Sequence, residues 1–461
     1  SSIASPDSAS GLPTQDTSSG TLSSGFRPPI MHTPQAAPGF NVIGFVTGNL
    51  GLGVTARSVV QVLLDKGHPV AVLDVDPGLN RGRQDLTFAT HAVENATDLP
   101  YDINLLVAPP AGLQPLLDDH PSLVTRAGCF NAAFSPWELP VVPAKWLDCL
   151  EVMDVLIGES DFIRNTFANH VSGIPTIAAR HPLYLPDRMR PARDRFGLPE
   201  RAVLFVISFE PGSDPQRKNP LGAIEAFCRA FPDDASAHLA IRVNNARADS
   251  AAAPVLEQLY QRIAADARIH VIDEPLNYSD VLGLYASCDA FVSLHRSEGL
   301  GLGPMEAMML GKPVVATAWS GNMSYMDHSN SCLVGYRLVP VDGVMPQYQR
   351  GLIGQSAVWA DPRLDEAVGW MRRLAADPVL RREIGERARD SMTRYQADAK
   401  RGVFVDELRA IHRQRGFLPV LPEREERRAR LATWWLRVPE GNAAELEVPH
   451  KGVGSVRVVI A

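Results

Sequence analysis

Short apolar segments alternate with longer amphipathic ones through residues 203–316, and this alternation restricts the possible folds more than any other feature. The apolar segments are predicted strands at 203–207, 239–243, 269–272, 290–294 and 313–316. The segments between them, at about 221–231, 253–265 and 279–286, have the residue spacing of helices. Because each helix returns the chain to start a strand parallel to the last one, the alternation predicts a doubly wound α/β domain.

The same alternation begins earlier, at Asn41. An apolar run, the Gly-rich turn TGNLGLGV, a helix and a second apolar run form a βαβ unit, and runs at 103–108 and 155–157 predict further parallel strands. Prolines at 182, 186, 191 and 199 punctuate a charged stretch that is typical of a linker. We therefore predict two Rossmann-like domains, 41–185 and 186–400, that face each other across a ligand-binding cleft.

The two ends of the sequence differ from these domains. Residues 1–40 are rich in Ser, Pro, Thr and Gly, which predicts a disordered leader. Residues 401–461 are predicted to form a C-terminal helix and an extension of one or two strands. The helix EREERRARLATWWLRV is expected to pack on the core, with a peripheral membrane contact as the alternative. Because the sequence begins with Ser and not Met, a longer natural chain is a further alternative.

Composition excludes several classes of protein. The net charge of -7 provides no overall basic field for nucleic acid. The five cysteines are scattered without C-x2-C spacing, which argues against a disulfide framework and against structural zinc. The sequence has no apolar run of about 18 residues and no signal-peptide layout. We expect a cytoplasmic protein, with the inner face of the membrane as the alternative location.

The stretch SEGLGLGPMEAMMLGKPVVAT places Glu298 in a loop after a predicted strand and Glu306 on the first turns of a helix. Carboxylates suit vicinal hydroxyl groups, and the intervening glycines let backbone N–H groups approach a diphosphate. This combination predicts a nucleotide-sugar site. The alternative is a solvated loop charge and a first-turn acid that the helix dipole favours.

This stretch resembles the E-x7-E signature of retaining GT-B glycosyltransferases, particularly the bacterial family-four enzymes that build polysaccharides and glycolipids. The flanking CDAFVSLHR and AWSGNMSYM extend the resemblance, which covers about 41–395. It implies that Glu298 binds the hydroxyls of the donor sugar and that Glu306 binds those of the ribose. The segment SFEPGSDPQRKNPLGAIEAF is similar to the one whose basic pair, here Arg217 and Lys218, holds the donor diphosphate.

One departure concerns the diphosphate site. Many members of the family carry an Arg directly after the first strand of the second domain, where this chain has Ser208. Arg217 or Arg296 is expected to substitute for it, although a solvated charge pair is the commonest fate of residues such as Arg217 and Lys218. The remaining expected donor-binding residues are Gly299, Leu300, Gly301, Leu302 and His295.

The first domain is expected to hold the acceptor. Gly48, Asn49, Gly51 and Gly53 form a predicted phosphate and acceptor loop. The rival interpretation is a dinucleotide site with Asp74 or Asp76 as the ribose ligand, but the glycines follow G-x-x-G-x-G and not G-x-G-x-x-G. In FSPWELP, Trp137 and Glu138 are either an acceptor-side wall or an ordinary aromatic contact.

Cleavage of a sugar–diphosphate bond builds negative charge on the leaving phosphate, which Arg217, Lys218 and the helix amides are expected to stabilise. The resemblance implies attack by an acceptor hydroxyl from the leaving-group face, with no protein nucleophile, no metal and no cofactor besides a UDP-, GDP- or dTDP-linked donor. The expected acceptor is a glycan or lipid-linked glycan, and no nucleic acid partner is expected. Two alternatives remain, a catalytically inactive GT-B scaffold that binds a glycan or partner, and an NAD-dependent enzyme.

Overall fold

The computed structural model describes residues 38–76, 85–126, 128–186, 189–245, 250–414, 444–450 and 454–460. The predicted leader lies outside the described residues except for its last three positions, and the predicted helix at 423–438 lies wholly outside them. Strands β15 (Ala444–His450) and β16 (Gly454–Ile460) pair antiparallel, which confirms the predicted terminal strands. None of the described helices is both long enough and apolar enough to cross a membrane.

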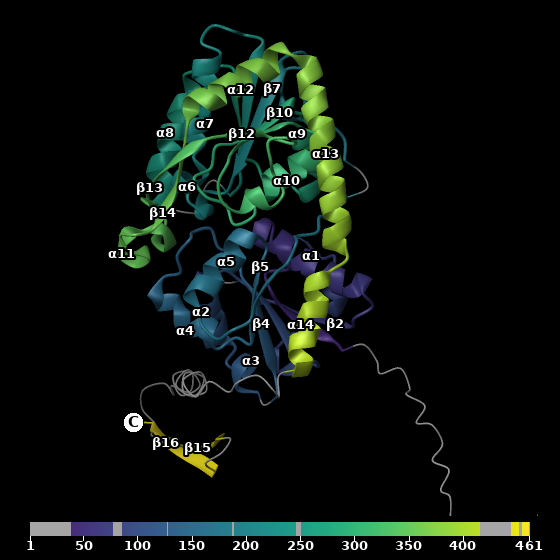
Figure 1. Cartoon of the computed structure of the whole chain (residues 1–461), viewed down its shortest axis with the longest axis vertical. Coiled ribbons are helices and arrows are strands. Elements are labelled where there is room, and N and C mark those ends of the chain that lie inside the picture. The colour runs from purple at the N-terminus through teal and green to yellow at the C-terminus, as the bar shows by residue number, and fades with distance from the viewer. Residues whose placement is uncertain are drawn as a thin grey trace, which may run out of the picture. The chain divides into compact units, whose positions relative to one another are not determined.

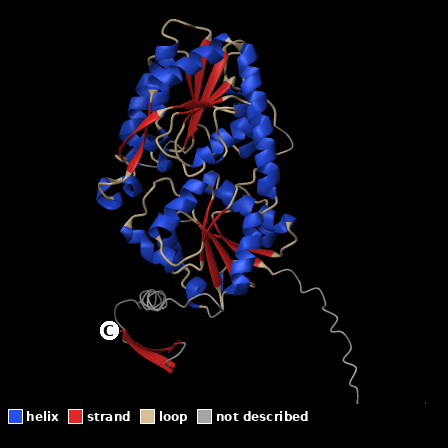
Figure 2. Ribbon diagram, viewed as in Figure 1, coloured by secondary structure: helices blue, strands red, loops and turns tan. Residues whose placement is uncertain are grey.

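The first sheet has six parallel strands in the order β2-β1-β3-β4-β5-β6. Its strands are β1 (Phe40–Gly44), β2 (Val70–Asp74), β3 (Ile103–Val107), β4 (Phe130–Phe134), β5 (Val155–Gly158) and β6 (Thr176–Ala178). Both faces are covered by helices (Figures 1 and 2). Buried side chains place α1 (Gly51–Asp65) and α14 (Val403–Gln414) on one face, and α2 (Pro110–Asp119), α4 (Leu147–Glu151) and α5 (Asp161–His170) on the other.

The second sheet also has six parallel strands, in the order β12-β11-β10-β7-β8-β9. They are β7 (Val203–Phe209), β8 (Ala237–Val243), β9 (Ile269–Ile272), β10 (Ala290–Ser293), β11 (Val314–Thr317) and β12 (Cys332–Val334). One face packs against α7 (Pro220–Ala230), α8 (Ala253–Ala264) and α12 (Leu364–Ala376). The other packs against α9 (Tyr278–Ser287), α10 (Leu302–Met309) and α13 (Pro378–Lys400).

The predicted doubly wound α/β class is therefore confirmed in both halves, and each predicted strand is present with small shifts at its ends. Strands β4, β6 and β12 were not predicted: β4 has the sequence FNAAF, and the other two have three residues each. The predicted boundaries at 185/186 and 400/401 stay predictions. The helix that follows the second boundary, α14, returns to pack on the first sheet through Phe404, Val405 and Leu408.

An excursion from the second domain, which we define as residues 336–362, was not predicted either. Strands β13 (Tyr336–Pro340) and β14 (Val358–Pro362) pair antiparallel, and the chain between them includes α11 (Arg350–Ile353). The buried side chains of Met345 and Tyr348 pack in the same core cluster as Trp137 and Trp146 of the first domain. The excursion therefore fastens the second domain to the first.

The strand orders fix where a ligand site can form. In the second sheet the chain proceeds from β7 to β9 in one direction and from β10 to β12 in the other. The loops after β7 and β10 therefore leave in opposite directions and open a crevice between the carboxyl ends of these two adjacent strands. Arg217 and Lys218 follow β7, and Glu298 follows β10, so the crevice lies between the residues of the two motifs.

A row of buried asparagines crosses the first sheet. Asn41, Asn104 and Asn131 are in register on β1, β3 and β4, and each is 2% exposed or less. The Asn41 amide donates to Asn104 Oδ1 at 2.7 Å, and the Asn104 amide donates to Asn131 Oδ1 at 2.8 Å. Because buried polar groups cost free energy when they lose their partners, the middle residue is the most sensitive.

We predict that Asn104→Leu lowers the free energy of unfolding by about 1–3 kcal/mol, the cost of leaving buried amide groups without partners. Urea denaturation followed by tryptophan fluorescence measures this loss. The control is Asn95→Leu, because Asn95 is an exposed residue of the same domain. Equal urea midpoints for the two variants would show that the row contributes nothing to stability.

Candidate active site

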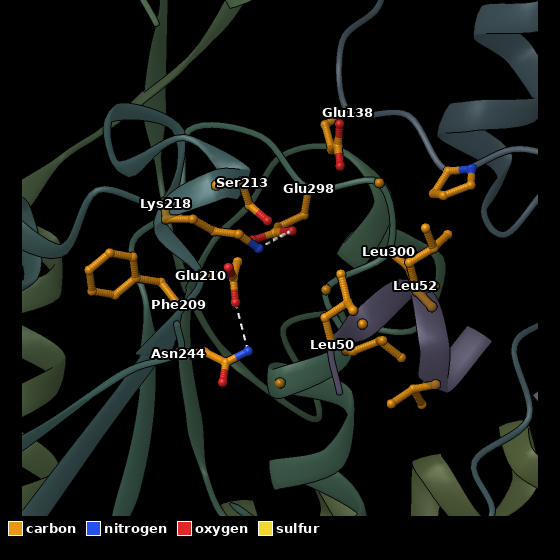
Figure 3. Close-up of a pocket in the computed structure, with 18 of the residues that line it drawn as sticks. Leu50, Leu52, Glu138, Phe209, Glu210, Ser213, Lys218, Asn244, Glu298 and Leu300 are labelled. Atoms are coloured by element: carbon orange, nitrogen blue, oxygen red, sulfur yellow. Dashed lines mark hydrogen bonds and ion pairs between the residues drawn. The ribbon is translucent and has the colours of Figure 1, made fainter. Parts of the chain in front are cut away.

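A pocket of about 580 Å³ lies between the carboxyl ends of the two sheets. Residues from the loops after β1, β7 and β10 and from the first turns of α9 and α10 line it. Figure 3 shows charged and polar side chains, among them Lys218, Glu298 and Glu210, on one side and Leu50 and Leu300 on the other. The pocket therefore has a charged wall and an apolar wall.

The helical turn α6 (Pro215–Lys218) presents the predicted basic pair. Asp214 accepts hydrogen bonds from the backbone N–H groups of Gln216 and Arg217, and Asn219 caps the start of α7 and donates to Leu294 O at 2.8 Å. Asp214 and Asn219 both have positive φ, at 70° and 54°. Residues persist in this strained backbone region only when their surroundings hold them there, and it is common at ligand sites.

Lys218 and Glu298 meet across the crevice. Lys218 Nζ lies 2.6 Å from Glu298 Oε1 and 2.9 Å from Oε2. Dashed lines mark the contact between these two residues in Figure 3. The Glu298 N–H donates to Ser320 Oγ at 2.8 Å, and the Gly321 N–H donates to Glu298 O at 2.8 Å. A Cβ at Gly321 would collide with the carbonyl oxygen of Gly299, so only glycine fits beneath this loop.

The Glu298 carboxyl is ionised. Burial favours its neutral form, but the charges of Lys218 and Arg217 outweigh burial and lower the pKa of Glu298 to about 2. A carboxylate with so low a pKa is a weak base. It is well suited to accept hydrogen bonds from hydroxyl groups.

Arg217 differs from its neighbour because its side chain is only 2% exposed. Its guanidinium donates to Ser297 O at 2.8 Å and lies 3.3 Å from Glu298 Oε2 and 3.6 Å from Glu138 Oε1. The Tyr348 hydroxyl donates to Glu138 Oε2 at 2.7 Å. Arg217 thus contacts one carboxylate from each domain, and Tyr348 of the excursion is hydrogen-bonded to one of them, Glu138.

Glu306 lies on α10 and faces α9. The Tyr278 hydroxyl donates to Glu306 Oε1 at 2.9 Å. Burial raises the pKa of Glu306 to about 7, against the opposing effects of the Tyr278 hydrogen bond and the Arg242 charge. The two motif glutamates therefore differ in charge near neutral pH: Glu298 is ionised, and Glu306 is poised between its two forms.

The glycine-rich loop of the first domain contacts the second domain. Asn49 donates from its amide to Leu276 O at 2.9 Å, and Asn49 and Gly51 line the pocket. Gly48 and Gly53 do not line it; a Cβ at Gly53 would collide with Gly48 O, so these two glycines shape the turn. Both carboxylate oxygens of Asp74, the ribose ligand of the dinucleotide alternative, accept hydrogen bonds from Thr47.

The other predicted donor-site residues separate into two groups. Those that line the pocket are Ser208, Gly299, Leu300, Gly301 and Leu302. His295 and Arg296 do not line it. The His295 ring is fully buried against Ser293 and Asn322, and the Arg296 guanidinium lies 3.3 Å from Asp361 Oδ1 and donates to Gln216 O.

Trp137 and Glu138 line the pocket from the first domain. The Trp137 ring stacks on that of Tyr348 at 5.8 Å between centroids and 8° between planes. The backbone of Gly299 approaches so closely that a Cβ there would lie 2.8 Å from Trp137 O. Trp137 therefore belongs to the interdomain packing, and Glu138 is the polar member of the pair.

Several pocket residues were not predicted. Arg242, Asn244 and Glu210 lie at the carboxyl ends of β7 and β8, where Asn244 donates to Glu210 Oε2 at 2.6 Å. Asn244 comes directly after one predicted strand and Glu210 comes shortly after another, which was an available signal, whereas Arg242 lies within the predicted strand 239–243. The excursion residue Tyr348 had no such signal, because its contacts with the first domain are distant in sequence. Among the described residues, no group of three or more His, Cys, Asp and Glu side chains is placed to hold a metal ion.

Comparison with known proteins agrees with this geometry. The model of the family described as Glycosyl transferases group 1 matches residues 256–338, which include both motif glutamates. D-inositol 3-phosphate glycosyltransferases of Mycobacterium bovis and Mycobacterium tuberculosis are 26% identical to this chain over 208 residues. The match covers 43% of this chain and 41% of each relative, so this chain aligns with less than half the length of these relatives.

Solved structures share the architecture. Sucrose-phosphate synthase from Thermosynechococcus elongatus aligns with a TM-score of 0.60 and 14% identity, over 81% of this chain and 99% of that one. HepE from Anabaena, in complex with UDP and glucose, aligns with a TM-score of 0.57 and 13% identity, over 80% and 99%. The shared architecture shows that this chain has the GT-B fold. The match to the family model and to the curated relatives supports the resemblance to family-four glycosyltransferases that the E-x7-E motif predicted.

Proposed function

We propose that the protein is a retaining glycosyltransferase that moves a hexose or deoxyhexose from a nucleotide sugar to a glycan or glycolipid acceptor. The observation that carries this proposal is the ionised Glu298 carboxylate, held by Lys218 and Arg217 at the crevice of the second sheet. The bond to be cleaved joins a sugar to a phosphate. The carboxylate can accept hydrogen bonds from the sugar hydroxyls, and the adjacent cation can bind the phosphate. We assign the role to bacterial surface polysaccharide synthesis on the motif resemblance.

The reaction assigns a task to each side of the pocket. The acceptor hydroxyl oxygen bonds to the anomeric carbon, and the bond from that carbon to the phosphate oxygen breaks, with its electron pair passing to the phosphate. Lys218 and the amides at the start of α10 stabilise this new charge. Glu298 holds the sugar hydroxyls, Glu306 holds the ribose hydroxyls, and the acceptor's proton passes to the leaving phosphate.

We propose retention because Glu298, the carboxylate that the family resemblance assigns to the donor sugar, is a poor base. With a pKa of about 2, Glu298 cannot take a proton efficiently from an acceptor, whereas general bases work best with a pKa near the operating pH. Attack from the leaving-group face needs no protein base. Asn49, Gly51 and Glu138 of the first domain would then border the acceptor.

The proposal predicts turnover of one nucleotide sugar from a panel of UDP-, GDP- and dTDP-linked sugars, in the presence of EDTA. Release of the nucleoside diphosphate measures turnover, and the anomeric proton couplings of the product give its configuration. An α-linked donor is expected to give an α-linked product. An inverted linkage would contradict the retaining mechanism. Binding of a glycan without any turnover would favour the inactive scaffold, and binding of NAD alone would favour the dinucleotide enzyme.

The two motif glutamates are predicted to respond differently to substitution by glutamine. Glu298→Gln should lower kcat by about 10²-fold or more, because it removes the carboxylate from the sugar. It should bind the free nucleoside diphosphate at least as tightly as the wild type, because Lys218 is then free of its carboxylate partner. Glu306→Gln should instead lower the affinity for the free nucleoside diphosphate by about tenfold. Calorimetric titration measures both affinities, and equal binding to wild type and Glu306→Gln would contradict the ribose role.

The raised pKa of Glu306 predicts a pH dependence of nucleotide binding. An ionised carboxylate accepts both ribose hydroxyls, so the ligand favours the deprotonated form and affinity should rise with pH. With a pKa of about 7, the increase between about pH 6 and pH 8 should approach tenfold. Glu306→Gln lacks this titration and serves as the control for ionisation of the nucleotide phosphates. The same pH profile in the variant would show that Glu306 does not control binding.

A further inference from the structure

The positively charged side chains that line the pocket differ in whether their partners are carboxylates or neutral groups. Within the described residues, the Lys and Arg side chains that line it are Arg57, Arg217, Lys218 and Arg242. Arg57 pairs with Asp85 at 3.1 Å, and both Arg217 and Lys218 pair with Glu298. Arg242 donates to two neutral oxygens, Ser208 Oγ at 3.2 Å and Asn244 Oδ1 at 2.9 Å.

Arg242 also retains unused capacity for hydrogen bonds. Among the described residues its Nε is buried without a partner, and its guanidinium forms no ion pair. A buried charge or donor without a partner is costly, so an anion at this position would be strongly favoured. The guanidinium fork is suited to phosphate because it offers two parallel N–H donors.

The strand register places Arg242 at the crevice. Ser208 on β7 and Arg242 on β8 are paired residues of adjacent parallel strands, so their side chains share one face of the sheet. That face carries α9 and α10, and hence Tyr278 and Glu306. The small Ser208 side chain leaves room for the guanidinium to reach over the end of β7, the position where the family resemblance implies an arginine.

Neighbouring groups orient the guanidinium. Asn244, which accepts from Arg242 Nη2, is itself held by Glu210 Oε2 at 2.6 Å, and Figure 3 shows this pair below Lys218 in the pocket. The positive charge of Arg242 acts on Glu306 and lowers its pKa against the effect of burial. Arg242 therefore lies on the Glu306 side of the pocket, whereas Lys218 lies on the Glu298 side.

We propose that Arg242 is the second cation of the donor's diphosphate site and binds the phosphate nearer the ribose, while Lys218 serves the phosphate nearer the sugar. This assignment rests on the proposed glycosyltransferase function. It replaces both Arg217, whose guanidinium is buried between Glu298 and Glu138, and Arg296, which is held by Asp361. In this chain the arginine that the family resemblance implies at the end of β7 would be supplied instead by the neighbouring strand β8.

The test transfers the arginine from position 242 on β8 to position 208 on β7. Arg242→Ser and the double variant Ser208→Arg/Arg242→Ser are titrated calorimetrically with UDP, GDP and dTDP, each beside its own nucleoside. Arg242→Ser should lower the affinity for the nucleoside diphosphate by about 10- to 100-fold. It should leave the affinity for the nucleoside unchanged, because only the phosphates lose a charged donor. The double variant should bind the diphosphate at least about tenfold more tightly than Arg242→Ser. The values of kcat/KM for the wild type and the two variants should rank in the same order as these affinities. Arg337→Ser, which removes an exposed charge from the same domain, is the control and should behave as the wild type.

Each other result contradicts a specific claim. If the wild type binds none of the three diphosphates, the proposed function itself fails. If the wild type binds one and Arg242→Ser binds it equally well, only the role of Arg242 fails. A parallel loss of nucleoside binding would show that Arg242 supports the fold of the pocket and not the phosphate, and a loss that Ser208→Arg does not recover would contradict the proposed position of the charge.

Discussion

The partly buried contact between Lys218 and Glu298 is the interaction on which the rest of the site depends. It joins the loop after β7 to the loop after β10 across the crevice that the strand order creates. Glu298 is itself buried, and a buried charge that loses a partner costs free energy. Both loops are therefore built to keep the pair in place, through the capped turn α6 on one side and the Ser320 and Gly321 contacts on the other.

The pair also explains why the two motif glutamates of the pocket differ in charge. Cations on two sides keep Glu298 ionised, whereas Glu306 has a tyrosine hydroxyl as its hydrogen-bond partner and a pKa of about 7. An ammonium already bound to a carboxylate can bind a phosphate only by sharing or leaving that partner. In the proposed reaction, donor binding would replace the contact within the protein by two contacts with the ligand, one from Glu298 to the sugar hydroxyls and one from Lys218 to the phosphate.

The sequence predicted the parts of the site that follow directly from strand order. Lys218, Glu298 and Glu306 all come shortly after predicted strands, and the carboxyl ends of parallel strands meet at one edge of a sheet. The direction of each side chain was not predictable in the same way. Arg217 and Lys218 are adjacent on one short turn and share Glu298, but only Arg217 also contacts Glu138 of the first domain.

Contacts distant in sequence account for most of what was missed. Arg296 is withdrawn from the pocket by Asp361, which arrives with the excursion. That excursion also brings Tyr348 to Glu138 and Trp137, and nothing in its local pattern indicates a partner in the other domain. Arg242 was overlooked because a polar residue near the end of a strand fits the strand pattern as well as it fits a binding site.

A crystal structure with an unreactive analogue of the donor identified from the panel tests the central claim most directly. The account predicts that Lys218 Nζ lies within hydrogen-bond distance of a phosphate oxygen, and that the Glu298 carboxylate accepts from a hydroxyl of the sugar. An analogue bound elsewhere, with the contact between Lys218 and Glu298 unchanged and no ligand atom near either residue, would contradict it.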